Sequence, residues 1–147
     1  MADVSLRARW ARYRHAIAHE PLPCALVDLD AFDANLERLL RPVRENGKTL
    51  RPATKSIRVP AILRRVLDRG GSAVSGLMTY SARETLFLAE DGFRDLLLAY
   101  PTVQRSDVDA LARAAKLTTT RVVCDSPEHL EALDAAAERT GTVLGVI

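Results

Sequence analysis

The residue best suited to covalent chemistry is a lysine that follows a short apolar segment. The stretch 50–56 has the sequence LRPATKS, so Lys55 lies at the carboxyl end of a predicted strand and just before a predicted helix. Enzymes of the α/β class gather their reacting groups at that edge of the sheet. Arg51 and Arg58 flank the lysine and favour its neutral amine, which is the form that makes a Schiff base with a carbonyl compound. By position alone, a solvated loop lysine is the commoner alternative.

Two further residues could accompany Lys55 in a pocket, and each has two interpretations. Tyr100 ends a later apolar strand, where it could stack or hydrogen-bond near a cofactor or serve as a buried structural tyrosine. Arg51 could hydrogen-bond near a cofactor ring or simply anchor the end of the sheet. The sequence does not separate these alternatives.

The other candidate side chains have simpler explanations. His15 and His19 show the i, i+4 spacing of some helical metal sites, but the sequence offers no third ligand near them. His129 is expected to be an exposed helix residue. Asp28 and Asp30 flank a strand end, and we assign Asp30 to the N-cap of the following helix. We assign none of these residues to catalysis.

Cysteine and glycine patterns give no alternative site. Cys24 and Cys124 lie far apart, each in or beside an apolar run, so we expect two buried free thiols. Gly70, Gly71 and Gly76 do not form a Gly-x-Gly-x-x-Gly or Walker pattern, and we expect them at turns and strand ends. No metal site is predicted within this sequence.

Strands that alternate with helices must position these residues. Apolar runs predict strands at 24–29, 49–54, 72–76, 96–100, 121–124 and 142–147. Helical periodicity and capping signals predict helices at 5–19, 31–44, 57–68, 81–90, 106–116 and 127–139. This alternation requires right-handed crossovers and a parallel sheet, so the fold class is α/β, either doubly wound or a (β/α) barrel.

Length and the final residues favour a partial barrel. A complete (β/α)8 barrel takes about 250 residues, whereas this sequence has 147 and ends within the apolar run 143–147. We therefore expect a barrel that is cut off partway. Residues 1–20 are predicted to form a separate amphipathic helix, with Leu6, Trp10, Tyr13 and Ile17 on one stripe, and residues 21–147 the barrel portion.

The bulk composition excludes several classes of protein. Hydrophobic residues make up 48% and charged residues 27% of the chain, as in ordinary globular domains, so disorder and coiled coil are excluded. A net charge of +2 is too small to indicate a nucleic-acid partner. The sequence shows neither a signal peptide nor a membrane span. We expect a cytoplasmic protein whose partner is a small molecule, with no nucleic-acid or membrane partner.

Several blocks together resemble a known family. They are Leu22-Pro23-Cys24-Ala25-Leu26-Val27-Asp28-Leu29-Asp30, then Asn35, then Leu50-Arg51-Pro52-Ala53-Thr54-Lys55, then Leu96-Leu97-Leu98-Ala99-Tyr100-Pro101. In order and spacing they resemble the N-terminal domain of the D-threonine aldolase and D-serine dehydratase-like family. That family belongs to the alanine racemase fold type of pyridoxal-phosphate enzymes. The resemblance covers nearly all of the chain from Leu22 onward.

The resemblance implies a fold, a cofactor and an assembly. It makes Lys55 the residue that holds pyridoxal 5'-phosphate as a Schiff base. It implies a barrel that begins with the strand leading to Lys55, of which about five of eight strands are present, and a strand at 25–29 that pairs with a C-terminal β domain. The cofactor phosphate and, in metal-dependent members, a divalent metal are held by parts of the family outside this sequence. Intact members are homodimers.

The resemblance also implies an activity. It indicates a lyase that acts on a D-amino acid, by retro-aldol cleavage or dehydration of a β-hydroxy substrate, with the cofactor as electron sink. An amino-acid racemase of the same fold, a non-catalytic pyridoxal-phosphate-binding protein and an inactive fragment are the alternatives. This chain departs from the family at Ala53, where histidine is usual, and at Ser56-Ile57, where threonine-histidine is frequent.

Overall fold

A computed structural model describes residues 5–147, which divide into two compact units between Leu39 and Leu40. In the first unit, helix α1 spans Leu6–Ala16, and the hydroxyl of Ser5 accepts a hydrogen bond from the N–H of Ala8 at 3.3 Å. No residue of α1 is buried. The predicted helix is therefore confirmed, although it ends three residues early. The predicted domain division at residue 20 stays a prediction.

Asp28, and not Asp30, caps the second helix. Helix α2 spans Leu29–Glu45, and the Asp28 carboxylate accepts hydrogen bonds from the N–H groups of Asp30 and Ala31, both at 3.1 Å. Tyr13 and Arg12 also donate to this carboxylate. The hydrogen bond from Tyr13, then those from the backbone and the charge of Arg12, hold the pKa of Asp28 below its ordinary value. The prediction of Asp30 as the cap was wrong by two residues.

The predicted strand at 24–29 does not form within the described chain, and its pairing with a C-terminal β domain stays a prediction. Residues 24–28 carry no regular secondary structure, and the side chains of Leu26 and Val27 are about half exposed. A strand needs a neighbour for its backbone N–H and C=O groups, and no described residue pairs with this segment. Cys24 is exposed and Cys124 is half-buried, so the two thiols are free as predicted but not fully buried.

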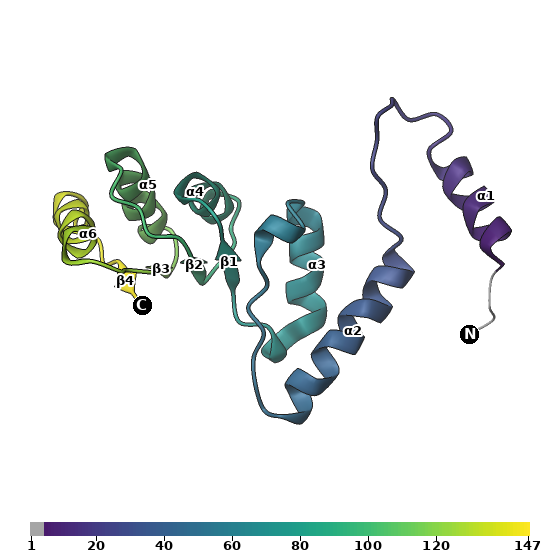
Figure 1. Cartoon of the computed structure of the whole chain (residues 1–147), viewed down its shortest axis with the longest axis horizontal. Coiled ribbons are helices and arrows are strands. Elements are labelled where there is room, and N and C mark those ends of the chain that lie inside the picture. Colours follow the sequence, from purple (N-terminus) through teal and green to yellow (C-terminus); the bar gives the residue numbers. More distant parts are fainter. Residues whose placement is uncertain (1–4) are drawn as a thin grey trace. The chain divides into compact units, whose positions relative to one another are not determined.

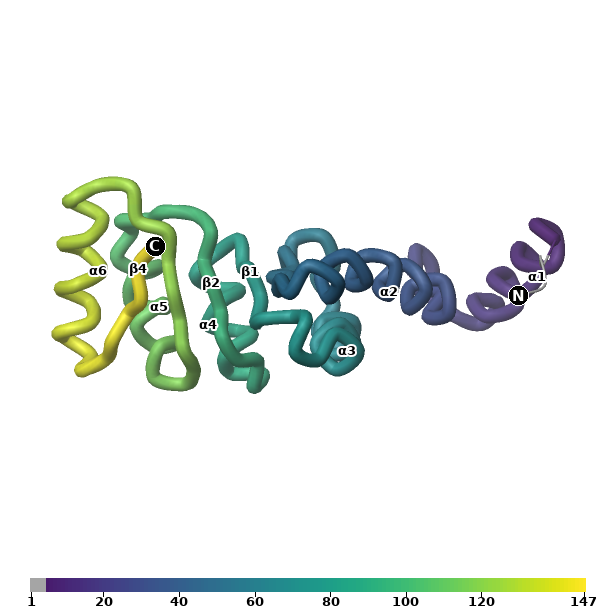
Figure 2. Tube along the Cα trace, turned by 90° about the horizontal axis from the view of Figure 1, so that it is seen from below, coloured from purple at the N-terminus to yellow at the C-terminus, as the bar shows by residue number. Residues whose placement is uncertain are grey.

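The second unit is built on a four-stranded parallel sheet whose strands follow in chain order, β1-β2-β3-β4. The strands are Leu77–Thr79, Leu96–Leu98, Thr120–Val122 and Gly145–Val146. Helices α4 (Ala82–Glu90), α5 (Arg105–Ala115) and α6 (Pro127–Thr140) connect them and lie along one face of the sheet (Figures 1 and 2). A doubly wound sheet would reverse its strand order and carry helices on both faces. The arrangement is therefore that of a partial barrel.

The first strand of the barrel is irregular. Residues 50–53 run parallel to 74–78 through two isolated bridges, Leu50 with Val74 and Ala53 with Met78. Pro52 has no N–H to donate, although its carbonyl accepts from Met78 at 2.8 Å. The predicted strand 49–54 is thus reduced to a bridged segment that leads into a 3₁₀ turn, Thr54–Ser56. Helix α3 follows at Pro60–Gly70.

Because of the conformation of Gly76, the next strand begins later in the chain than the sequence predicts. The sequence predicts a strand at 72–76, but Gly71–Ala73 forms a 3₁₀ turn and β1 begins only at Leu77. Gly76 has a φ of +59°, which interrupts an extended strand. A Cβ atom at this position would lie 2.0 Å from the carbonyl oxygen of Asp95. The close approach of two backbones therefore requires glycine and fixes where β1 starts.

Two hydrophobic clusters fill the space between the sheet and its helices. One contains Leu98, Val122, Leu111 and Leu133 with neighbouring alanines, under α5 and α6. The other contains Leu63, Leu77, Leu88, Phe93 and Leu96, under α3 and α4. Strands buried in this way suit a parallel sheet. No helix within residues 5–147 is both long and apolar enough to cross a membrane.

Candidate active site

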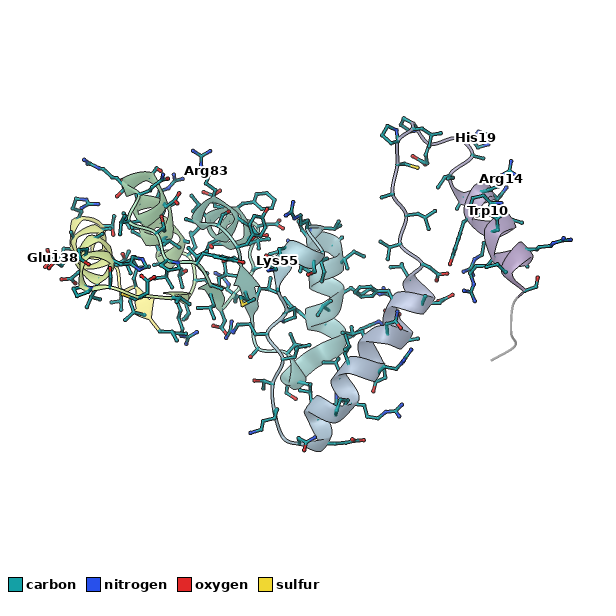
Figure 3. All side chains as sticks on the ribbon, viewed as in Figure 1. Trp10, Arg14, His19, Lys55, Arg83 and Glu138 are labelled. Atoms are coloured by element: carbon teal, nitrogen blue, oxygen red, sulfur yellow. The ribbon has the colours of Figure 1, made fainter. Side chains whose placement is uncertain are left out.

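Lys55 lies at the carboxyl end of the sheet. It sits in the 3₁₀ turn that follows the bridged segment 50–53, and its side chain is exposed (Figure 3). Its Nζ donates to the hydroxyl of Tyr100 at 3.4 Å, and Tyr100 follows the carboxyl end of β2. Within residues 5–147 no carboxylate forms an ion pair with this amine. The structure thus brings two of the predicted site residues together and leaves the amine open to a ligand.

A buried threonine and a glutamate hold the Lys55 turn in place. Thr54 is fully buried, and its hydroxyl donates to Glu84 Oε2 at 2.8 Å. The same carboxylate oxygen accepts the N–H of Tyr80 at 3.0 Å. Glu84 therefore connects the turn that carries Lys55 to the loop after β1. Its backbone N–H binds the Ser81 hydroxyl at the start of α4, which fixes the helix that presents it.

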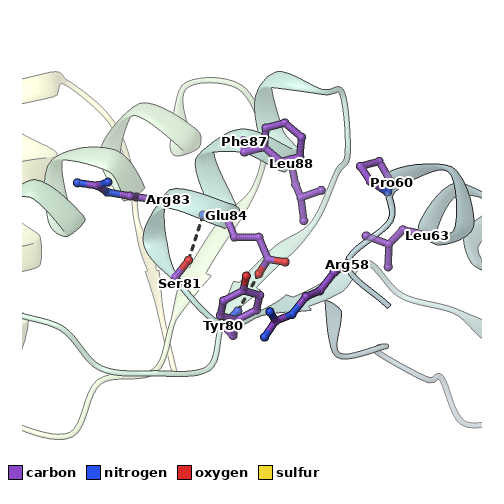
Figure 4. Close-up of a pocket in the computed structure, with 9 residues that line it drawn as sticks. All are labelled: Arg58, Pro60, Leu63, Tyr80, Ser81, Arg83, Glu84, Phe87 and Leu88. Atoms are coloured by element: carbon purple, nitrogen blue, oxygen red, sulfur yellow. Dashed lines mark hydrogen bonds between the residues drawn. The ribbon is translucent and has the colours of Figure 1, made fainter. Parts of the chain in front are cut away.

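Beside this connection lies a cavity of about 350 Å³ between the starts of α3 and α4. Figure 4 shows Arg58 and Tyr80 side by side at its polar end; Pro60, Leu63, Phe87 and Leu88 supply apolar walls. The Arg58 guanidinium stacks over the Tyr80 ring at 5.0 Å, and its Nε donates to the carbonyl of Lys55 at 3.2 Å. Arg58 also has a φ of +52°, which is unusual for a residue other than glycine. This strained arginine thus links the Lys55 turn to Tyr80 in the loop after β1.

Arg51 lies at the other end of the sheet. Its guanidinium donates to the carbonyl oxygen of Asp95 at 2.8 Å and to the Asp95 carboxylate at 2.7 Å, and Arg121 binds the same carboxylate. Asp95 immediately precedes β2, so these contacts are at the amino ends of the strands. They match the sheet-anchor interpretation of Arg51. Its role in cofactor binding stays a prediction that these contacts do not support.

The histidines differ from their predicted environments. His129 was expected to be exposed but is buried at 1% exposure, in the first turn of α6, where its ring contacts Thr102 in the loop after β2. His15 and His19 are both exposed, and α1 ends at Ala16, so they do not share a helical face. Within the described residues no three His, Cys, Asp or Glu side chains come together to hold a metal ion.

Sequence reasoning missed Glu84 and Tyr80 as parts of this region, and it gave Arg58 only as a charged neighbour of Lys55. One signal was available for Glu84, since Ser81-x-x-Glu84 is a capping-box pattern that predicts a glutamate near a helix start. Tyr80 directly precedes that pattern, as Tyr100 follows the next strand. The contacts of Arg58 depend on a backbone conformation that the sequence does not reveal.

The fold and site together define a class of protein: a (β/α) barrel portion with a lysine exposed at the carboxyl edge of its parallel sheet. The family model for the alanine racemase N-terminal domain matches residues 27–147. The chain therefore belongs to the alanine racemase N-terminal domain family, and the predicted relationship is confirmed.

Two characterised proteins give the comparison more detail. The chain is 29% identical over 125 residues to 3-hydroxy-D-aspartate aldolase of Paracoccus denitrificans (strain Pd 1222), a match that covers 84% of this chain and 32% of that enzyme. The crystal structure of D-threonine aldolase from Filomicrobium marinum superposes with a TM-score of 0.80 at 27% identity, covering 86% of this chain and 34% of the other. This chain spans about a third of the length of each relative. Both relatives are named as aldolases that act on D-amino acids.

Proposed function

We propose that this chain forms the lysine-bearing part of a pyridoxal-phosphate-dependent lyase that acts on a β-hydroxy D-amino acid. The observation that carries the proposal is the placement of Lys55 at the carboxyl edge of the sheet, with its amine exposed and in contact with the Tyr100 hydroxyl. The names of the two relatives support aldol cleavage over the other reactions of the family. Family membership supports pyridoxal 5'-phosphate as the cofactor.

The donor set around Lys55 fits this cofactor. An aldehyde cofactor needs an accessible amine that is not held in an ion pair by a carboxylate, and Lys55 meets this condition within the described chain. Tyr100 and Tyr80 follow neighbouring strands at the same edge and could pack against a flat ring. Lys55 would hold the cofactor through a Schiff base. When bound, the cofactor supplies an electron sink for the electrons released at the substrate Cα.

Other side chains of this chain would orient the Lys55 amine and hold its turn in place. The Tyr100 hydroxyl, 3.4 Å from Nζ, would orient the Lys55 amine and accept one of its protons in a hydrogen bond. Glu84 would hold the turn still by binding Thr54 and the loop after β1. Fixing a reactive amine in one geometry lowers the entropy cost of reaction. On this proposal Glu84 is a positioning residue and Lys55 the catalytic one.

The cofactor claim is tested by reductive trapping. The chain has three lysines, Lys48, Lys55 and Lys116, and all three are exposed, so selectivity among them would be chemical and not a matter of access. Incubation with pyridoxal phosphate, borohydride reduction and peptide mass spectrometry should place the label on Lys55 and leave the other two near background. Lys116→Ala should change nothing, whereas Lys55→Ala should abolish selective labelling. Equal labelling of all three lysines would refute the proposal.

The reaction class needs a separate measurement. Retro-aldol cleavage breaks the Cα–Cβ bond of the substrate and releases an aldehyde and glycine, whereas dehydration releases water and leads to a keto acid and ammonia. A racemase would release none of these and would invert Cα. A preparation that passes the trapping test should therefore be assayed with D-threonine, L-threonine and 3-hydroxy-D-aspartate. Aldehyde from the D substrates alone supports the lyase, and inversion without aldehyde supports the racemase.

A further inference from the structure

We propose that His129 is a positioning residue whose buried ring keeps the Tyr100 hydroxyl beside the Lys55 amine. The proposal rests on the function proposed for Lys55 and adds a residue from a different helix, three strands along the sheet from the Lys55 turn. Nothing in the local sequence around His129 predicts this role. The argument depends on what the imidazole touches.

His129 binds the backbone of the loop that carries Tyr100. Its ring is 1% exposed, and its Nε2 accepts the N–H of Thr102 at 3.3 Å. The histidine is itself fixed, because it lies in the first turn of α6 and its N–H donates to the Ser126 cap at 3.2 Å. Thr102 is half-buried, and losing a hydrogen bond to a fully buried imidazole costs free energy, so this contact restricts where Thr102 can lie.

The same loop is held from a second side. The Thr102 hydroxyl donates to the Asp107 carboxylate of α5 at 3.0 Å and accepts the N–H of Gln104 at 3.3 Å. Thr102 is therefore held between α5 and α6, two residues after Tyr100. With Thr102 fixed, the chain between β2 and Thr102 has little freedom, and the Tyr100 ring projects toward Lys55.

The tautomer of His129 follows from these contacts. Because Nε2 accepts a hydrogen bond, the neutral ring carries its proton on Nδ1. Nδ1 is buried and has no hydrogen-bond partner, and its nearest charged neighbour is Asp125 Oδ1 at 3.8 Å. A histidine retained in the core only for packing would not need the acceptor at Nε2. The contact with Thr102 therefore gives the ring a positioning role that a leucine of similar volume lacks.

The test is a double-mutant cycle with the trapping assay as its readout. Label on Lys55 is divided by label on Lys48 and Lys116, which serve as internal references in every variant. Tyr100→Phe removes the hydroxyl and should lower this ratio about three- to tenfold, the worth of one hydrogen bond. His129→Leu should lower it by a similar factor. His129→Gln, whose side-chain oxygen can accept from Thr102, should restore most of the ratio.

The decisive variant combines the two changes. If His129 acts through Tyr100, His129→Leu should have no further effect in the Tyr100→Phe background, since the group that it positions is gone. A lower ratio in the double variant than in Tyr100→Phe would overturn the proposal. So would a His129→Leu protein that melts cooperatively and labels as the wild type does. Thermal melts of each variant show whether the protein is folded when labelled.

A second readout separates this inference from the proposed function. Competitive acetylation with trace acetic anhydride reports the reactivity of each amine without any cofactor. If the wild-type chain shows no selective trapping, the proposed function fails, but His129 can still be tested. His129→Leu and Tyr100→Phe should then shift the pH profile of Lys55 acetylation in the same direction, with Lys48 and Lys116 unchanged. Shifts in opposite directions, or a shift with Tyr100→Phe and none with His129→Leu, would show that His129 does not act through Tyr100.

Discussion

One buried hydroxyl decides how firmly the Lys55 turn is held. Thr54 is fully buried and donates to the half-buried Glu84 carboxylate at 2.8 Å. Thr54→Val keeps the shape of the side chain but leaves that carboxylate without one of its two donors. Hydrogen bonds to charged groups are worth about 1.5–3 kcal/mol, so we expect a loss of that size in the free energy of unfolding. Urea denaturation followed by circular dichroism measures it.

An exposed threonine gives the matched control for this prediction. Thr119 is exposed, and Thr119→Val should change the free energy of unfolding by no more than about 0.5 kcal/mol. The Thr54 variant should also lose part of its selective trapping at Lys55, because the turn is less rigid. An unchanged urea midpoint for Thr54→Val would mean that water or another donor replaces the hydroxyl.

Asp95, at the opposite end of the sheet, should make the free energy of unfolding depend on pH. Partial burial of Asp95 opposes ionisation, but hydrogen bonds and charge from Arg51 and then Arg121 outweigh it and hold the pKa of the carboxyl below its ordinary value. The folded state therefore binds this proton less readily than the unfolded state does. Its contribution to stability is complete above the ordinary aspartate pKa of about 3.9 and is lost as the pH falls through that range and below.

The variant Asp95→Asn isolates this effect. It should be less stable than the wild type at pH 7, because it loses the two arginine ion pairs. The difference between the two proteins should shrink as the pH falls below about 4, because the unfolded wild-type chain then binds a proton that the folded state binds only at lower pH. Urea unfolding at several pH values provides the comparison. A difference that stays constant across that range would show that Asp95 does not supply the pH dependence.

At the scale of elements, substitutions at two glycines with nearly equal φ can distinguish the cost of backbone strain from the cost of steric crowding. Gly76 has a φ of +59° and Gly47 a φ of +60°, but a Cβ on Gly76 would lie 2.0 Å from a backbone oxygen, whereas one on Gly47 meets nothing within 4 Å. Gly47→Ala should therefore cost only the left-handed backbone penalty of about 1–2 kcal/mol. Gly76→Ala should cost about 3–5 kcal/mol, because β1 and the Asp95 backbone must separate. Similar costs for the two variants would contradict the close approach.

Helices could be predicted from this sequence better than strands could. Ser126 caps α6 at the start that the sequence predicts, and Ser81, the first residue of the predicted helix 81–90, is the cap of α4, because a cap acts within four residues. The strands are only two or three residues long, so their limits depend on pairing with distant segments. Gly76 shows the difference: its turn displaced β1 from 72–76 to Leu77–Thr79, and no local pattern signals the approach of Asp95.

Only part of the candidate site could be predicted from the sequence. Lys55 and Tyr100 could be placed at the carboxyl edge, because each follows an apolar run that becomes a strand or a bridged segment. Arg51 faces the other end of the sheet, since it precedes Lys55 by four residues in an extended segment, and its partner Asp95 is 44 positions away. His129 was expected to be exposed, because a helix pattern with alanines around it does not distinguish its buried face from its solvent face. Tertiary contacts decided both cases.

At the scale of the whole molecule, strand order explains why chemistry gathers at one edge. Each βα unit adds its strand next to the previous one, so the residues after successive strands line up along the carboxyl edge. Lys55, Tyr80 and Tyr100 follow three neighbouring strand positions along this edge. Helices α4, α5 and α6 supply the side chains that hold their loops, namely Glu84, Asp107 and His129. The same repetition puts Arg51, Asp95 and Arg121 along the amino edge, where both arginines bind the Asp95 carboxylate. One end of the sheet is thereby stabilised by ion pairs while the other keeps an open amine.

Stability should be unequal along the chain, and hydrogen exchange can measure the difference. Five residues of α5 are buried, namely Val108, Ala110, Leu111, Ala112 and Ala114, whereas no residue of α1 is buried. An isolated helix of 11 residues is marginal in water, so α1 should open without unfolding of the sheet. Peptides from α5 should therefore exchange at least about a hundredfold more slowly than peptides from α1, after correction for intrinsic rates. Equal protection of the two helices would mean that something covers α1 in solution, and a repeat at tenfold lower protein concentration would show whether that cover is a second copy of the chain.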